Sequence, residues 1–345
     1  MSSITGMELV SEFTPERVAA HFPIDKERRI NTLDRPLIIE SACPGWQVGG
    51  ARFPAVPISI EDQIRETVDS IRAGAVAVHM HPRDPKTGNA QANPKLLARI
   101  LGPVFDEVGD YVTLSHTWAA HQQVDYIVET QELLELGGGN KYCQGSVVLK
   151  SGHLSATGTF HPKKNIIEGV KWLEANDIKP IFQLYDTYVL RDFMINIIDP
   201  GVATKRPFVF NLHLGKHHSH TIDRDPWSFL QLLTNYNMVM DTLGPDTIVG
   251  VYPGGRNWLP VLVFGLLLGA PLVRVGIEDC YWVYPHKDEI IKKNSDMVVL
   301  VREIAERLGR RIVTEPDEAR QILGIKLTSA RGSRALAAPK VAALA

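Results

Sequence analysis

The chain has 345 residues, of which 44% are hydrophobic, and it carries a formal net charge of −2. This length fits two average domains or one large α/β barrel, and the hydrophobic content is typical of a folded protein. The near-neutral charge excludes an electrostatic case for binding nucleic acid or a membrane surface. Cys43, Cys143 and Cys280 lie far apart without a CxxC pair, which argues against a disulfide framework and favours the cytoplasm.

Residues 1–35 precede the first predicted strand and are interpreted as an N-terminal extension. Short apolar runs then alternate with amphipathic stretches as far as residue 325. Strands are predicted at Pro36–Ala42, Ala75–His81, Tyr111–Ser115, Gly145–Leu149, Pro180–Tyr185, Phe208–Leu214, Thr247–Val251 and Pro271–Gly276. Helices are predicted at Ile60–Ala73, Pro94–Val108, Asn165–Ala175, Trp227–Leu243 and Leu259–Leu268.

This alternation predicts an α/β fold, a (β/α)8 TIM barrel over residues 36–325. A doubly wound open sheet is the competitor, but no G-x-G-x-x-G motif follows the first strand. Two extra C-terminal helices are expected, one over Asp288–Leu308 and one starting at Thr314-Glu315-Pro316 with Thr314 as cap. Residues 326–345 are interpreted as a flexible or subunit-packing tail.

The most informative motif is His79-Met80-His81, at the end of the second predicted strand. Strand side chains alternate between faces, so both imidazoles point the same way, about 6.5 Å apart along the backbone. Two neutral imidazoles with one further protein ligand make a catalytic zinc site that keeps an open position. For this motif alone, two partly buried histidines satisfied by hydrogen bonds remain an equal alternative.

The last predicted strand ends in a second group of polar residues. Period-two alternation turns Arg274 and Glu278 toward the barrel interior, the face shared by His79 and His81. Because barrel active sites form at the carboxyl ends of the strands, Glu278 is predicted as the third zinc ligand. Asp279 is predicted as a base, and Arg274 as the residue that orients it or binds a substrate carboxylate. A structural Arg274–Glu278 ion pair is the competing interpretation.

Other polar residues are weaker candidates. Asn211 and His213 share one face of the sixth predicted strand, so either is expected to line the pocket. Gly254-Gly255-Arg256 follows the seventh strand, where Arg256 and the glycines suit a substrate phosphate or form an ordinary loop. An exposed loop is predicted for the histidine cluster His217, His218 and His220.

The segments His79–Asp84, Arg274–Asp279 and Gly309–Gly324 resemble the β-keto acid cleavage enzyme family, whose type member cleaves 3-keto-5-aminohexanoate. The resemblance is specific over residues 75–84 and 247–325 and looser between them. It implies a zinc-dependent acyltransferase on a TIM barrel. Such an enzyme condenses a 3-oxo acid with its co-substrate acetyl-CoA to give acetoacetate and a new acyl-CoA. It also implies a homo-oligomer such as a tetramer.

The resemblance also implies roles for individual residues. The zinc ligands would be His79, His81 and Glu278. Arg274 and Asp279 would form the pair that activates the substrate, and the hydroxyls of Ser115 and Ser146 would contact it. Two carboxylates shape the amine site of the type member, whereas Gln47 and Gln183 stand at the aligned positions here. A neutral amide offers an ammonium no charge attraction, so a substrate without the 5-amino group is expected unless both glutamines lie outside the pocket.

Two other functions fit the same residues. A zinc hydrolase on this barrel would use metal-bound water, and two histidines, a carboxylate and a nearby aspartate suit it too. A metal-binding barrel without catalysis is the third possibility. Turnover of a 3-oxo acid without a thioester would favour the hydrolase.

Overall fold

The computed structural model describes residues 14–21, 26–45, 53–114, 126–137, 147–148, 163–185, 188–215 and 228–326. The chain divides into two units, Met1–Asn31 and Thr32–Ala345. In the first unit, α1 (Pro15–His21) follows Thr14, whose Oγ1 accepts a hydrogen bond from the Arg17 N–H at 3.3 Å. This contact satisfies one of the backbone donors that a helix start leaves unpaired.

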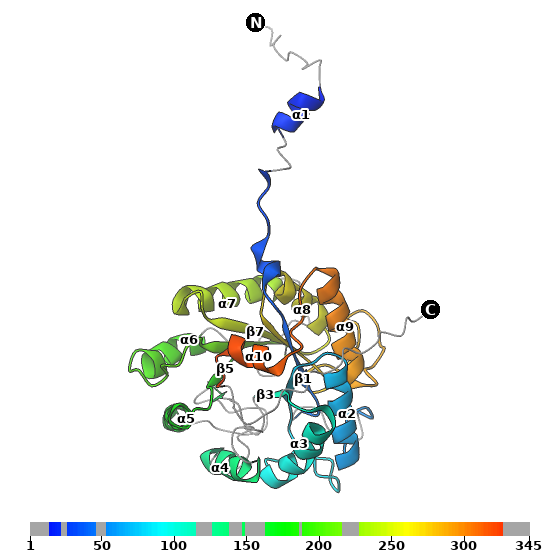
Figure 1. The fold of residues 1–345 in the computed structure, drawn as a ribbon, viewed down its shortest axis with the longest axis vertical. Coiled ribbons are helices and arrows are strands. Elements are labelled where there is room, and N and C mark those ends of the chain that lie inside the picture. The colour runs from blue at the N-terminus through cyan, green and yellow to red at the C-terminus, as the bar shows by residue number, and fades with distance from the viewer. Residues whose placement is uncertain are drawn as a thin grey trace, which may run out of the picture. The chain divides into compact units, whose positions relative to one another are not determined.

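Eight parallel strands form one curled sheet in the second unit (Figure 1). They are β1 (Ile38–Ala42), β2 (Ala77–His79), β3 (Val112–Thr113), β4 (Val147–Val148), β5 (Ile181–Leu184), β6 (Val209–Leu214), β7 (Ile248–Pro253) and β8 (Leu272–Val275). Their order is β3-β2-β1-β8-β7-β6-β5-β4. The first strand therefore pairs with the last, as in a closed barrel, and the predicted (β/α)8 TIM barrel is confirmed.

Helices follow the strands and cover the outer face of the sheet (Figure 1). They are α2 (Ile60–Arg72), α3 (Pro94–Val108), α4 (Tyr126–Gly137), α5 (Lys163–Ala175), α6 (Tyr188–Phe193) with the π-helix η3 (Met194–Ile198), α7 (Ser228–Leu243) and α8 (Trp258–Leu267). A short 3-10 helix, η2 (Asn31–Asp34), precedes β1. Ser59 and Asn93 cap α2 and α3, accepting hydrogen bonds at 3.0 Å from the N–H groups of Asp62 and Leu96. In the described part of the chain, no helix has the length and apolar character needed to cross a membrane.

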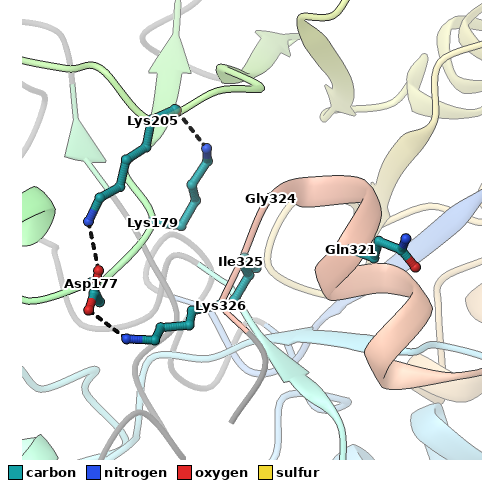
Figure 2. A pocket seen from close by; sticks show the side chains of 7 residues that line it. All are labelled: Asp177, Lys179, Lys205, Gln321, Gly324, Ile325 and Lys326. Atoms are coloured by element: carbon teal, nitrogen blue, oxygen red, sulfur yellow. Dashed lines mark hydrogen bonds and ion pairs between the residues drawn. The ribbon is translucent and has the colours of Figure 1, made fainter.

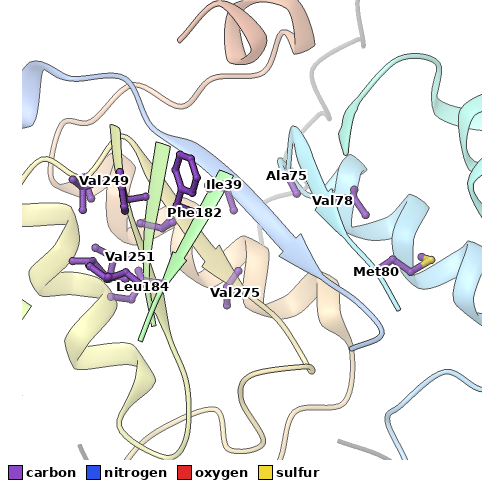
Figure 3. Close-up of a cluster of buried hydrophobic side chains, with 14 of the residues drawn as sticks. Ile39, Ala75, Val78, Met80, Phe182, Leu184, Val249, Val251 and Val275 are labelled. Atoms are coloured by element: carbon purple, nitrogen blue, oxygen red, sulfur yellow. The ribbon is translucent and has the colours of Figure 1, made fainter. Parts of the chain in front are cut away.

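The main hydrophobic core lies between the sheet and its helices (Figure 3). Alternate strand residues such as Val78, Phe182, Val251 and Val275 face outward into it. A second cluster fills the barrel interior, and its members include Ile38, Leu272, Ile181 of β5 and Val209 of β6. The two clusters follow from the period-two alternation of buried parallel strands, so polar inward positions are the exceptions that need an explanation.

Two C-terminal helices complete the unit, α9 (Asn294–Arg307) and α10 (Pro316–Leu323). The expected helix start at Asp288 is wrong, because Ile290 forms an antiparallel bridge with Trp282 and helix begins only at Asn294. The expected cap at Thr314 is also wrong. Glu315 occupies the N-cap position, and no side-chain hydrogen bond caps the helix.

Helix α10 closes the amino-terminal end of the barrel, where Ala319 and Leu323 join the interior cluster. Beside it lies an open pocket of about 470 Å³, lined by residues before β5 and β6 and at the end of α10 (Figure 2). Asp177 binds Lys205 at 3.0 Å and Lys326 at 2.7 Å across this pocket. Barrel active sites form at the opposite, carboxyl ends of the strands, so these ion pairs are better explained as part of the barrel's closure.

Candidate metal centre and active site

Two histidines after β2 form one side of a buried cluster. His79 ends β2 and pairs in register with Ala42 of β1. His81 is the next inward residue, and its backbone N–H donates to the Pro44 carbonyl at 2.9 Å, which continues the alignment with the β1 segment. The two side chains are buried, and their ring centroids lie 4.7 Å apart. The structure thus places both imidazoles on the same side of the chain.

Glu278 reaches the same point from the segment after β8. Its Oε2 lies 2.7 Å from Nε2 of His79, and its Oε1 lies 3.8 Å from Nε2 of His81. One ligand atom from each of the three residues lies within 4.8 Å of the others. Two imidazoles and one carboxylate form a donor set that catalytic zinc uses, with a coordination position left for substrate.

The protonation pattern of His79 fits a bound cation. Nδ1 of His79 lies 3.2 Å from the Leu114 carbonyl oxygen, which can only accept, so Nδ1 carries the proton. Burial, followed by the charge of Arg274, lowers the pKa of His79 and keeps the ring neutral. Nε2 therefore turns a lone pair toward the Glu278 carboxylate. A metal ion bound by both atoms would replace this repulsion with two favourable bonds.

Arg274 connects two carboxylates of the site. Its Nε and Nη2 lie 2.7 and 3.0 Å from the two carboxylate oxygens of Asp279, and Nη2 also lies 2.7 Å from Oε2 of Glu278. A bidentate contact of this kind fixes the plane of both partners. Burial alone would raise the pKa of Glu278, but the charge of Arg274, the largest opposing effect, holds it well below its ordinary value. Glu278 is therefore ionised, as a metal ligand must be.

A tight turn after β8 sends both Glu278 and Asp279 toward Arg274. Gly276 has a φ of +151°, and a Cβ there would lie 2.3 Å from the Ala42 carbonyl oxygen. The Asp279 N–H donates back to the Gly276 carbonyl at 3.0 Å. In an extended strand, consecutive residues would face opposite sides. The turn explains why the ligand and the candidate base are neighbours both in sequence and in space.

The loop after β1 makes room for Glu278. A Cβ on Gly45 would come within 1.8 Å of the Glu278 Cγ, so only glycine leaves this carboxylate its place. Arg83 holds the loop, since its guanidinium donates to the Gly45 carbonyl and, at 3.0 Å, to the Gly88 carbonyl. The segments after β1, β2 and β8 thus form one interlocked rim around the candidate metal centre.

Strands β5 and β6 contribute a polar wall to the barrel interior. His213 Nε2 lies 2.5 Å from Gln183 Oε1, and the His213 ring stacks on Tyr185 with centroids 4.5 Å apart. Asn211 lies at the inward position before His213, and neither atom of its amide finds a hydrogen-bond partner in the described part of the chain. Gln183 and Asn211, both expected at the pocket, share this wall.

Sequence reasoning missed a buried pair below Arg274. Glu40 of β1 is fully buried and accepts a hydrogen bond from the Tyr252 hydroxyl of β7. Burial raises the pKa of Glu40 to about 8, against the opposing effects of Arg274 and Tyr252. A carboxylate in the middle of the apolar run Ile38–Ala42 was the available signal. Its meaning depends on the strand pairing, which the sequence does not show.

The remaining expectations divide in two. The candidate substrate residues Ser115, Ser146 and Gln47, like the cluster His217, His218 and His220, lie outside the described residues. Arg256 follows β7 as expected, but its guanidinium binds Asp288 at 2.6 Å and stacks over the Trp282 ring at 4.2 Å. These contacts give Arg256 a structural role, and a contact with substrate stays a prediction.

Comparison with known proteins finds relatives that match most of the chain. The chain is 29% identical over 293 residues to the 3-keto-5-aminohexanoate cleavage enzyme of Fusobacterium nucleatum subsp. nucleatum, covering 84% of this chain and 98% of that protein. It is 25% identical over 316 residues to the 3,5-dioxohexanoate:acetyl-CoA acetone transferase of Paraburkholderia graminis, covering 85% of this chain and 96% of that protein. The apo structure of ObcA shares the fold with a TM-score of 0.60 at 18% identity, covering 79% of this chain and 66% of that chain.

A family model also matches most of the chain. Residues 36–325 match the model that describes the beta-keto acid cleavage enzyme. The matched residues include the candidate ligands His79, His81 and Glu278 and the pair formed by Arg274 and Asp279. The chain therefore belongs to the β-keto acid cleavage enzyme family.

Proposed function

We propose that this protein is a zinc-dependent enzyme that condenses a 3-oxo acid with acetyl-CoA and releases acetoacetate and a new acyl-CoA. One observation carries the proposal, the bidentate hold of Arg274 on Asp279 beside three metal-ligand candidates. A hydrolase needs an activated water, whereas a carboxylate locked in one orientation suits removal of a proton from carbon. The family match and the names of the relatives support the same reaction.

His79, His81 and Glu278 would hold the zinc, which supplies Lewis-acid polarisation of the 3-oxo group and a charge to stabilise an enolate. Asp279, oriented by Arg274, accepts a proton from C2 of the oxo acid. The C2 carbanion attacks the acetyl-CoA carbonyl and releases the CoA thiolate. The thiolate attacks C3, the C2–C3 bond breaks, and Asp279 returns its proton to C2 of acetoacetate.

The polar wall favours a substrate without a 5-amino cation. The Gln183 Oε1 faces His213 Nε2 at 2.5 Å, so the part of the amide left to meet a substrate is its NH2 donor. Gln183 Nε2 has no hydrogen-bond partner in the described part of the chain. A donor suits an oxo or carboxylate oxygen of the substrate and repels an ammonium group. The proposal therefore names an uncharged or acidic 3-oxo acid as substrate.

The test is a screen of 3-oxo acids with the zinc-loaded protein, with and without acetyl-CoA, read by mass spectrometry. Acetoacetate and a new acyl-CoA are expected only when the thioester is present. Consumption of the oxo acid without acetyl-CoA would instead establish a hydrolase. A clear preference for 5-amino-3-oxohexanoate over 3-oxohexanoate in kcat/KM would refute the proposed substrate class.

The proposal extends to the assembly and the compartment. A homo-oligomer is proposed from the likeness to the family, and light scattering after gel filtration measures it. A cytoplasmic location is proposed from the cysteine pattern, since Cys43, Cys143 and Cys280 lie far apart in the sequence without a CxxC pair.

A further inference from the structure

We propose that Glu40, acting through Tyr252, is a positioning residue that keeps the Arg274 guanidinium aligned with Asp279. The inference rests on the proposed function, because Asp279 is the proposed base. It concerns the layer of the barrel interior directly beside the candidate metal centre, where a buried carboxyl group has no part in the mechanism described so far.

Strand register places Glu40 next to Arg274. The two residues are direct partners in the parallel pairing of β1 with β8. In a parallel pair, partner side chains point to the same face, so Glu40 and Arg274 both face the barrel interior. Glu40 is 0% exposed, and its pKa responds to the charges of Arg274, Asp279 and Glu278, in that order.

Packing does not explain a carboxyl group at this position. The interiors of (β/α)8 barrels are filled mostly by branched aliphatic side chains, and an isolated carboxyl group is costly to bury. Oε1 of Glu40 has no hydrogen-bond partner in the described part of the chain, so the cost is not fully offset. A valine or isoleucine would fill the space without this cost. The residue is therefore better explained by its effect on neighbouring groups.

Tyr252 transmits that effect to Arg274. Its hydroxyl donates to Oε2 of Glu40, which fixes the outer end of the ring. The Arg274 Cζ lies 5.2 Å from the centre of the same ring, within the range of a cation–π contact. On another side, the His213 ring meets Tyr252 edge-on at 5.3 Å between centroids. A ring held in this way limits rotation of the guanidinium while Arg274 binds Asp279.

Two conservative variants test the inference. Tyr252→Phe removes only the hydroxyl, and Glu40→Gln keeps the shape but replaces the carboxyl group with an amide. Each is expected to lower kcat by about 10-fold to 100-fold, with the KM for acetyl-CoA and the zinc content unchanged. Because both substitutions act through the same hydrogen bond, the kcat of the double variant is expected to be no lower than that of the less active single variant. Tyr236→Phe is the matched control, since that buried hydroxyl contacts Arg35 instead and kcat is expected to stay unchanged.

Crystal structures of the variants supply a readout independent of activity. A rotated or lost Arg274–Asp279 fork in Tyr252→Phe would support the inference. Unchanged kcat in both variants, additive losses in the double variant, or loss of zinc from Glu40→Gln would each overturn it. If the wild-type protein turns over no 3-oxo acid, the proposed function fails, and the geometry of the fork in the variant alone decides the positioning role.

Discussion

At the scale of single residues, the three candidate ligands share one buried point but come from the ends of two strands that lie about 200 residues apart in sequence. Replacing any one of them leaves only two protein ligands for the metal ion. His79→Ala, His81→Ala and Glu278→Gln are each expected to lose most of the bound zinc, as measured by elemental analysis of the purified protein. The exposed His286 is the control, and His286→Ala is expected to keep full zinc. Wild-type occupancy in all three ligand variants would refute the site.

Asp279 separates catalysis from metal binding. Asp279→Asn keeps the size of the side chain but removes the basic oxygen, so turnover is expected to fall by about 100-fold to 10,000-fold while zinc remains bound. Steady-state rates and metal analysis on the same preparation measure both effects. Asp246→Asn, which alters a surface contact with Arg206, is expected to leave both unchanged. An Asp279→Asn enzyme as active as wild type would favour a barrel without the proposed base.

Glu40 links stability to pH. Burial raises its pKa from 4.5 to about 8, so between these values the folded state holds a proton that the unfolded state releases. Its contribution to stability is complete below pH 4.5 and is lost as the pH rises toward 8. This loss has a slope of up to about 1.4 kcal/mol per pH unit, and Glu40→Gln is expected to remove it. Urea unfolding at several pH values measures the slopes, and parallel curves for both proteins would contradict the assignment.

At the scale of elements, the segments after β1 and β8 depend on each other at Gly45. A Cβ on Gly45 would collide with Glu278, so Gly45→Ala is expected to displace this ligand and to abolish zinc binding without unfolding the barrel. Circular dichroism and metal analysis distinguish the two effects. Gly201 is the control because a Cβ there meets no atom within 4 Å. Gly201→Ala is expected to cost about 1 kcal/mol through its positive φ and to leave zinc bound.

The elements also show what the sequence can predict. Strand positions can be predicted from short apolar runs. The alternation of strand side chains, together with the location of barrel active sites at the carboxyl ends of the strands, predicts from sequence that His79, His81 and Glu278 lie at one end of the barrel. Predictions from the local sequence pattern failed where pairing between distant segments determines the structure. Ile290 continues a helical spacing but bridges Trp282 as extended chain, and the role of Glu40 depends on the pairing of β1 with β8. That pairing closes the ring between the first and last strands, which no local window contains.

At the scale of the whole second unit, the two ends of the barrel have separate tasks. The carboxyl ends of the strands carry the candidate metal centre, and the amino-terminal end is closed by α10. Arg320 of α10, almost fully buried, binds both carboxylate oxygens of Asp110 at 2.5 and 2.8 Å and the Tyr111 carbonyl at 3.0 Å. This contact joins the last helix to the segment before β3. Its loss should therefore affect the stability of the barrel and not its chemistry.

Arg320→Ala is accordingly expected to lower the free energy of unfolding by about 3 kcal/mol, because it breaks the largely buried ion pair between Arg320 and Asp110. Its kcat and zinc content per folded molecule should match wild type. Arg311 pairs with Glu318 of α10 at the surface, so Arg311→Ala is the control and is expected to cost less than about 1 kcal/mol. Denaturant unfolding with activity measured on the same samples makes the comparison. A fall in kcat for Arg320→Ala in fully folded protein would show that the two ends of the barrel are coupled.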